Sequence, residues 1–134
     1  MRKELYNAIK AKLTAEVPKV AHVDLWNHNV EFIEQEEGWE RPAVFVEFGP
    51  IAWEPNVGGG YRGKGTVRLH VVTDWTEGGQ GAAWELIGRI RSTMESVEGF
   101  GFHGLALAET ETNHNHEEIL ESIEVYAVRY VLHP

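Results

Sequence analysis

The strongest constraint on the fold is an amphipathic segment in the second half of the chain. Between residues 82 and 98, apolar side chains recur at spacings of three and four, which is the period of a helix with one buried face. The apolar stripe consists of Ala83, Leu86, Ile87, Ile90, Met94 and Val97. Gly99 follows, and we expect it to end the helix in a left-handed conformation. The pattern predicts a helix over 82–98 that packs on a sheet through this stripe.

A second amphipathic helix is expected at the N-terminus, over residues 2–17. Its apolar positions recur every fourth residue, at Leu5, Ile9, Leu13 and Val17. Pro18 ends the segment, because proline disfavours helical geometry in the residue before it.

Short segments of alternating or continuous apolar residues predict the strands. They cover residues 20–26, 30–35, 43–48, 66–74 and 118–132. Asn27–Asn29 is typical of a turn, and Gly49–Pro50 is expected to end the third strand. The last strand has apolar residues on both faces near its end, which favours a central strand or a subunit contact.

This order of elements predicts an α+β fold. Two helices and a mostly antiparallel β-sheet are expected to pack as a two-layer sandwich. The 134 residues suit a single domain over 1–134. Residues 54–65 hold five glycines and one proline, so we expect a flexible Gly-rich arm there, either a mobile loop or a long hairpin tip.

Composition excludes several classes of protein. The chain has no cysteine, which excludes disulfide scaffolds, thiol nucleophiles and cysteine-bound zinc. Its formal net charge of −9 argues against broad binding to nucleic-acid phosphates. The sequence holds no run of about 18 apolar residues, so no membrane-spanning helix is expected. Its first residues do not resemble a secretory signal.

Two motifs are candidate ligand sites. Residues 58–66 resemble a phosphate-binding loop, but Lys64 is followed by Gly65 and a strand, whereas such a loop needs Ser or Thr and then a helix. His114 and His116 alternate beside glutamates and could share a metal on one face of a strand. The other histidines are scattered, so no second cluster completes the ligand set. A hairpin arm and a polar loop are therefore the favoured interpretations.

No catalytic group stands out either. The serines available as nucleophiles are Ser92, Ser96 and Ser122, and none lies in a Gly-x-Ser-x-Gly turn. The glutamates between residues 31 and 40 are expected to form a solvated face, and the five tryptophans are expected in the core and at subunit interfaces. We predict no catalytic, cofactor-binding or metal-binding residue, and the chain is not expected to be an enzyme.

The layout of the chain resembles a known family. An N-terminal amphipathic helix, a Gly-rich excursion ending in Gly65–Val71, a second amphipathic helix and a long closing strand follow one another. The polar stretch Glu109–His116 (Glu-Thr-Glu-Thr-Asn-His-Asn-His) lies just before the closing strand. In this order the chain resembles the tail-terminator or tail-completion proteins of long-tailed bacteriophages, the group that includes the lambda-type minor tail protein U. The resemblance covers nearly the whole sequence.

The resemblance implies a structural role in a phage or prophage particle. Such proteins form a ring, usually of six subunits, that caps the finished tail tube and provides the surface on which the head docks. The implied partners are other copies of the chain, the tail tube protein and the head–tail connector. No cofactor, specific nucleic-acid binding or membrane is implied, and the protein would be made in the bacterial cytoplasm and reside in the tail or neck of the virion. An acidic protein around a DNA passage would repel the phosphates and let the genome slide.

Two other functions stay open from the sequence. One is a different head–tail connector or neck subunit with the same layout. The other is a small metal-dependent enzyme that uses His114, His116 and a glutamate.

Overall fold

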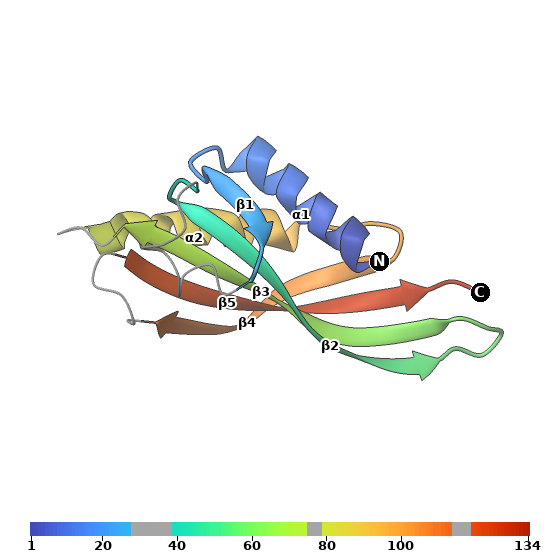
Figure 1. The fold of residues 1–134 in the computed structure, drawn as a ribbon. Coiled ribbons are helices and arrows are strands. Elements are labelled where there is room, and N and C mark those ends of the chain that lie inside the picture. The colour runs from blue at the N-terminus through green and yellow to red at the C-terminus, as the bar shows by residue number, and fades with distance from the viewer. Residues whose placement is uncertain (28–38, 75–78, 114–118) are drawn as a thin grey trace.

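The computed structural model describes residues 1–27, 39–74, 79–113 and 119–134 (Figure 1). In chain order its elements are α1 (Arg2–Glu16), β1 (His22–Leu25), β2 (Ala43–Pro55), β3 (Tyr61–Asp74), α2 (Gly79–Glu95), β4 (Phe102–Asn113) and β5 (Ile119–Leu132). Two helices and a mostly antiparallel sheet confirm the α+β class. The strand expected over 30–35 lies outside the described residues. Neither described helix is both long and apolar enough to cross a membrane.

The five strands form one sheet in the order β1-β2-β3-β5-β4. β1 runs parallel to β2, and all other neighbours are antiparallel. β5 pairs with β3 from Ile119 to Leu132 without a register shift, and β4 lies on its other side. The last strand of the chain is therefore an inner strand, as its apolar residues on both faces predict.

Both helices bury the stripes that their sequences predict. Leu5, Ile9 and Leu13 of α1 are fully buried, and so are Ile90 and Met94 of α2. These side chains share one hydrophobic core with strand residues. The strand members of that core are Val23, Val44, Val46, Val67, Leu69, Val71, Phe102, Leu105, Tyr126, Val128 and Tyr130.

Gly99 does not end α2, which corrects the sequence-based expectation. The helix ends at Glu95, where the amides of Ser96 and Val97 bond to carbonyls three residues back and tighten the last turn. The described glycines with positive φ are Gly58, Gly59, Gly60 and Gly104. A Cβ at Gly99 would lie 2.6 Å from the ring of Phe102, so this glycine makes room for an aromatic side chain.

β2 also continues through Gly49–Pro50, where the sequence predicts its end. The pairing with β3 shifts between Phe48 and Ile51, which is a β-bulge that accommodates a proline within a strand. A Cβ at Gly49 would lie 2.2 Å from Thr66 Oγ1, so the two strands approach closely at the bulge. The dipeptide thus bends the strand instead of ending it.

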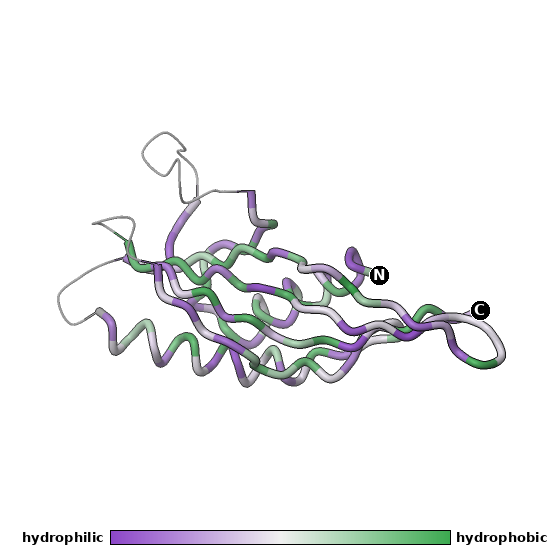
Figure 2. Tube along the Cα trace, turned by 90° about the horizontal axis from the view of Figure 1, so that it is seen from below, coloured by the Kyte–Doolittle hydropathy of each residue, from purple (hydrophilic) through white to green (hydrophobic). Residues whose placement is uncertain are grey.

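The Gly-rich segment forms a long hairpin whose tip is shorter than expected. Pro55 pairs with Tyr61, so only residues 56–60 form the turn and the rest of 54–65 belongs to strands. Three successive glycines in this turn have positive φ, a conformation open to glycine at little cost. The hairpin and the C-terminal end of β5 project beyond the first turn of α1 (Figures 1 and 2). We call residues 50–65 the arm.

Candidate functional site

The sheet has two faces of different chemistry, because successive side chains of a strand point to opposite sides. One face contributes Val67, Leu69 and Val71 of β3 to the core that contains the helix residues. The opposite face, called the outer face here, carries the alternate residues of β3 and their neighbours. On β3 these residues are Arg62, Lys64, Thr66, Arg68, His70 and Val72, and on β5 they are Glu121, Ile123, Val125, Ala127, Arg129 and Val131.

A buried histidine lies near one end of the outer face. His70 is 4% exposed, its Nδ1 lies 2.8 Å from Glu121 Oε2, and its Nε2 lies 2.8 Å from Glu47 Oε1. Both ring nitrogens therefore have a carboxylate partner, and the two carboxylates belong to different strands.

This contact extends across four strands. Asn113 Nδ2 of β4 donates to Glu121 Oε1 at 2.7 Å, and Arg68 Nη2 of β3 donates to Glu111 Oε2 at 2.8 Å. Arg68 Nε lies 3.8 Å from Glu47 Oε1, and this buried nitrogen makes no hydrogen bond to the described residues. The network links β2, β3, β5 and β4 through polar and charged side chains.

Aromatic rings cover the histidine. The Trp26 ring stacks on His70 with centroids 3.7 Å apart and parallel planes. Trp26 and Trp39 both pack edge-on against Phe45, in a second cluster that includes Val72. A histidine that is stacked, paired on both nitrogens and 4% exposed is suited to bracing the sheet, since no ring nitrogen is left to contact a substrate.

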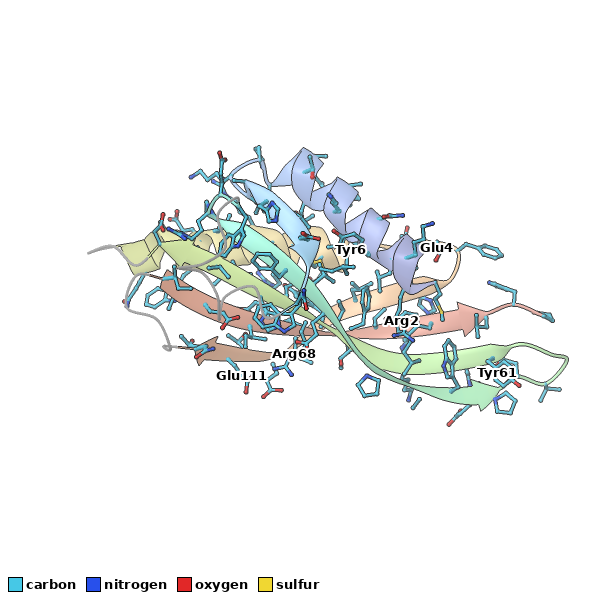
Figure 3. The ribbon with its side chains drawn as sticks, in the orientation of Figure 1. Arg2, Glu4, Tyr6, Tyr61, Arg68 and Glu111 are labelled. Carbon is cyan, nitrogen blue, oxygen red and sulfur yellow. The ribbon has the colours of Figure 1, made fainter. Side chains whose placement is uncertain are left out.

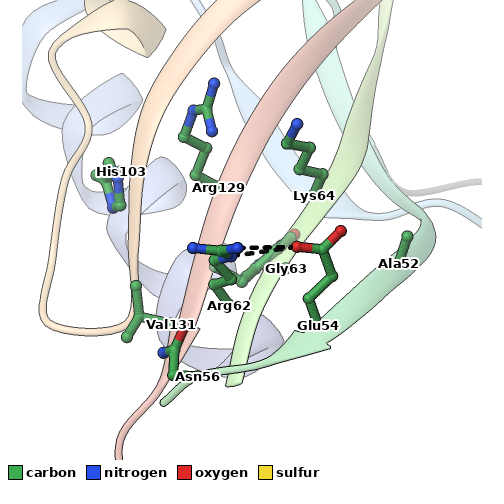
Figure 4. Close-up of a pocket in the computed structure, with 10 residues that line it drawn as sticks. Ala52, Glu54, Asn56, Arg62, Gly63, Lys64, His103, Arg129 and Val131 are labelled. Atoms are coloured by element: carbon green, nitrogen blue, oxygen red, sulfur yellow. Dashed lines mark hydrogen bonds and ion pairs between the residues drawn. The ribbon is translucent and has the colours of Figure 1, made fainter. Parts of the chain in front are cut away.

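The other end of the outer face, on the arm, is basic. A hollow of about 370 Å³ is lined there by Arg62, Lys64, His103 and Arg129, which we call the basic end (Figure 4). Lys64 pairs in register with Arg129, and Arg129 with His103, so three basic side chains lie in one row across three strands. Arg62 is bound by Glu54, with Nε and Nη2 both 3.2 Å from Oε2. Lys64 and Arg129 have no ion-pair partner among the described residues, so their charges are available to a ligand.

Exposed carboxylates lie on β4 at the opposite end. Glu109 and Glu111 pair in register with Val125 and Ile123, which places both on the outer face. We call these two residues the acidic end. Glu111 stays 51% exposed although it binds Arg68, and Glu109 has no ion-pair partner among the described residues. Figure 3 shows Arg68 and Glu111 together, far along the sheet from Tyr61 of the arm.

A buried carboxylate also lies on the inner side of β5. Glu124 is 1% exposed and accepts hydrogen bonds from the hydroxyls of Thr110 and Ser122. Burial, and secondarily the charge of Glu124, raises the pKa of Tyr126 far above its usual range. The hydroxyl of Tyr126 makes no hydrogen bond to the described residues. Tyr126 is therefore a neutral core residue instead of an acid–base group.

The structure argues against one of the two candidate ligand sites, and the histidines of the other lie outside the described residues. Residues 58–66 lead into β3 and not into a helix, so they lack the architecture of a phosphate-binding loop. His114, His116 and the glutamates at 31, 34, 36 and 37 lie outside the described residues. Among the described residues, no three His, Asp or Glu side chains are grouped so that they could hold a metal ion.

Sequence reasoning missed both the histidine network and the basic end. Their signal is present in the alternation of Arg62, Lys64, Arg68 and His70 along β3, which marks one polar face of a strand. The partners come from Glu47, Glu121 and Arg129, which lie far away in sequence. Only the register of the sheet brings these groups together.

The fold has a counterpart among solved structures. No protein-family model matches the chain, and no curated protein matches its sequence. The structure is similar to that of a chain in the "Virion of native gene transfer agent (GTA) particle", with a TM-score of 0.64 and 14% sequence identity. The match covers 94% of this chain and 93% of that chain. The two chains thus share a fold over almost their entire lengths.

Proposed function

We propose that this protein is a structural component of a phage-like particle, and within it a tail terminator. The observation that carries the proposal is the fold shared with a chain of a GTA virion over nearly the full length of both chains. The resemblance of the element order and of the Glu109–His116 stretch to tail terminators points to the same class of protein. We also propose that both helices pack on one side of the sheet, so that the fold is a two-layer sandwich.

In this role, copies of the chain form a ring, with six subunits as the expected number, on the end of the tail tube. The tube protein and the head–tail connector are its other partners. A projecting arm and a long exposed edge strand, β4, are features that can reach a neighbouring subunit. The net charge of −9 suits a ring around a DNA passage, because it repels the phosphates.

The proposal assigns the protein no catalytic activity, cofactor or membrane. The polar groups that the structure brings together around His70 are paired with one another and covered by Trp26. A head–tail connector or another neck subunit is the nearest alternative. It shares the virion location but differs in its effect on tail length.

The virion location is tested by finding the protein in particles. Particles are purified from a strain that carries an epitope-tagged copy of the gene, and their proteins are identified by mass spectrometry. Gold-labelled antibody then locates the tag by electron microscopy. The proposal predicts a label at the junction of head and tail. A protein absent from intact particles would contradict it.

A further inference from the structure

The outer face of the sheet carries opposite charges at its two ends. The basic end lies where the arm meets β5 and β4, whereas Glu109 and Glu111 of the acidic end lie toward the other end of β4. Arg129 lies four positions along β5 from Val125, the partner of Glu109, and six positions from Ile123, the partner of Glu111, which is roughly 13 Å and 20 Å at ~3.3 Å per residue. Both separations exceed ion-pair distance, so the two ends do not pair with each other within one subunit.

The basic end is unusual in this chain. The protein has 12 Lys and Arg against 21 Asp and Glu, yet Arg62, Lys64 and Arg129 gather around one hollow with a single carboxylate, Glu54. Exposed like charges repel one another, so such a cluster favours a ligand that brings negative charge. The hollow is lined by side chains of the arm, β4 and β5, which suits contact with the side chains of another protein surface.

We propose that the basic end binds the acidic end of a second copy of this chain, in a head-to-tail contact. Lys64 and Arg129 would receive Glu109 of the neighbour, since these three exposed charges have no ion-pair partner among the described residues. His103, on the edge strand β4 beside Arg129, borders the same contact. The two patches differ, so the contact is heterologous, and contacts of this type close into rings when the rotation permits.

This inference rests on the proposed function, from which it takes the ring, and it adds the surfaces that hold neighbouring subunits together. A nucleic acid is the alternative occupant. It would also bring negative charge, but the net charge of −9 opposes it, and Glu54 lies inside the hollow. The complementary charges at the two ends of one sheet favour a second copy.

The test uses charge reversal on the full chain. One variant carries Lys64→Glu and Arg129→Glu, and a second carries Glu109→Lys and Glu111→Lys. A control with Lys3→Glu and Lys10→Glu, two exposed residues of α1, matches the first variant in its change of net charge. Sedimentation velocity measures self-association up to millimolar concentration at low ionic strength, where exposed charges interact most strongly.

We expect the wild type and the control to associate, and each charge-reversed variant to associate at least about tenfold more weakly. A 1:1 mixture of the two variants should associate again, because each then offers the surface that the other lacks. This rescue also shows that both variants fold.

Three results would overturn the inference. The first is a wild type that stays monomeric at every concentration. The second is association that neither reversal weakens, and the third is a mixture that does not recover. Binding of double-stranded DNA by the monomeric wild type, lost in the Lys64→Glu, Arg129→Glu variant, would assign the basic end to nucleic acid instead. The proposed virion role is measured separately, by the presence of the protein in particles, so either claim can fail alone.

Discussion

His70 Nδ1 lies 2.8 Å from Glu121 Oε2, in a contact between two residues that are 4% and 3% exposed. The two residues are 51 positions apart in sequence and come together because β3 and β5 pair along their whole lengths. A buried carboxylate is costly unless it is paired and hydrogen-bonded. The contact therefore gives the buried Glu121 a partner on the neighbouring strand.

Replacing this histidine should destabilise the fold. In His70→Ala, Glu121 keeps Asn113 as a partner but loses the imidazole, and Trp26 loses the ring on which it stacks. We expect a loss of about 2–4 kcal/mol in the free energy of unfolding. Urea denaturation followed by circular dichroism measures it, with His103→Ala, an exposed histidine, as the control. Equal midpoints for the two variants would refute the bracing role.

A charge placed in the main core should prevent folding. Ile90 of α2 is fully buried in the cluster that α1, α2 and the sheet share. An unpaired carboxylate there costs several kcal/mol, which is comparable to the total stability of a small domain. We expect Ile90→Asp to abolish the thermal transition and Arg89→Asp, one residue away and exposed, to retain it. An unchanged melting temperature in Ile90→Asp would mean that the core is assigned wrongly.

Replacing each of two glycines by alanine should change the stability of the fold in opposite directions. A Cβ at Gly63 would lie 2.7 Å from the Trp53 ring and 2.8 Å from Ile51 Cγ2, whereas a Cβ at Gly88 would meet nothing within 4 Å. Gly63→Ala should cost about 1–3 kcal/mol through overpacking in the arm. Gly88→Ala should add about 0.5–1 kcal/mol, because glycine weakens a helix interior. Differential scanning calorimetry of both variants checks the pair, and a stabilised Gly63→Ala would contradict the tight packing.

The flexibility expected for residues 54–65 remains a prediction. Because residues 61–65 belong to a strand, we now expect it only in the turn, over residues 56–60. Residues 61–65 pair with β2 on one side and with β5 on the other. We expect their amides to exchange with solvent roughly tenfold or more slowly than those of Val57 and Gly58, which lie in the turn. Hydrogen–deuterium exchange of the monomer measures this contrast. Equally fast exchange across 54–65 would show that this whole segment is mobile.

The sequence predicts those parts of the fold whose stabilising contacts repeat locally. Ile90 and Met94 belong to a stripe that a helix must bury, so both helices could be placed to within a few residues. The inner position of β5 follows from its apolar residues on both faces. The network around His70 could not be predicted, because its partners depend on the register between distant strands.

The predictions from sequence were wrong at residues that can play more than one structural role. Gly49–Pro50 usually ends a strand but here forms a bulge, and Gly63 marks close packing against Trp53 instead of a loop. Gly99 accommodates the Phe102 ring instead of ending a helix. The polar residues 109–113 extend β4, because an edge strand can expose both of its faces and needs no apolar alternation.

The central claim, that this protein terminates the tail of a phage-like particle, is tested most directly by deleting its gene. Electron microscopy of the particles that form without the protein gives the distribution of tail lengths and the fraction of tails joined to heads. The account predicts tails of abnormal length that lack heads, and recovery of normal particles when the gene is restored. Headless tails of normal length would indicate a connector instead, and normal infectious particles would contradict the account.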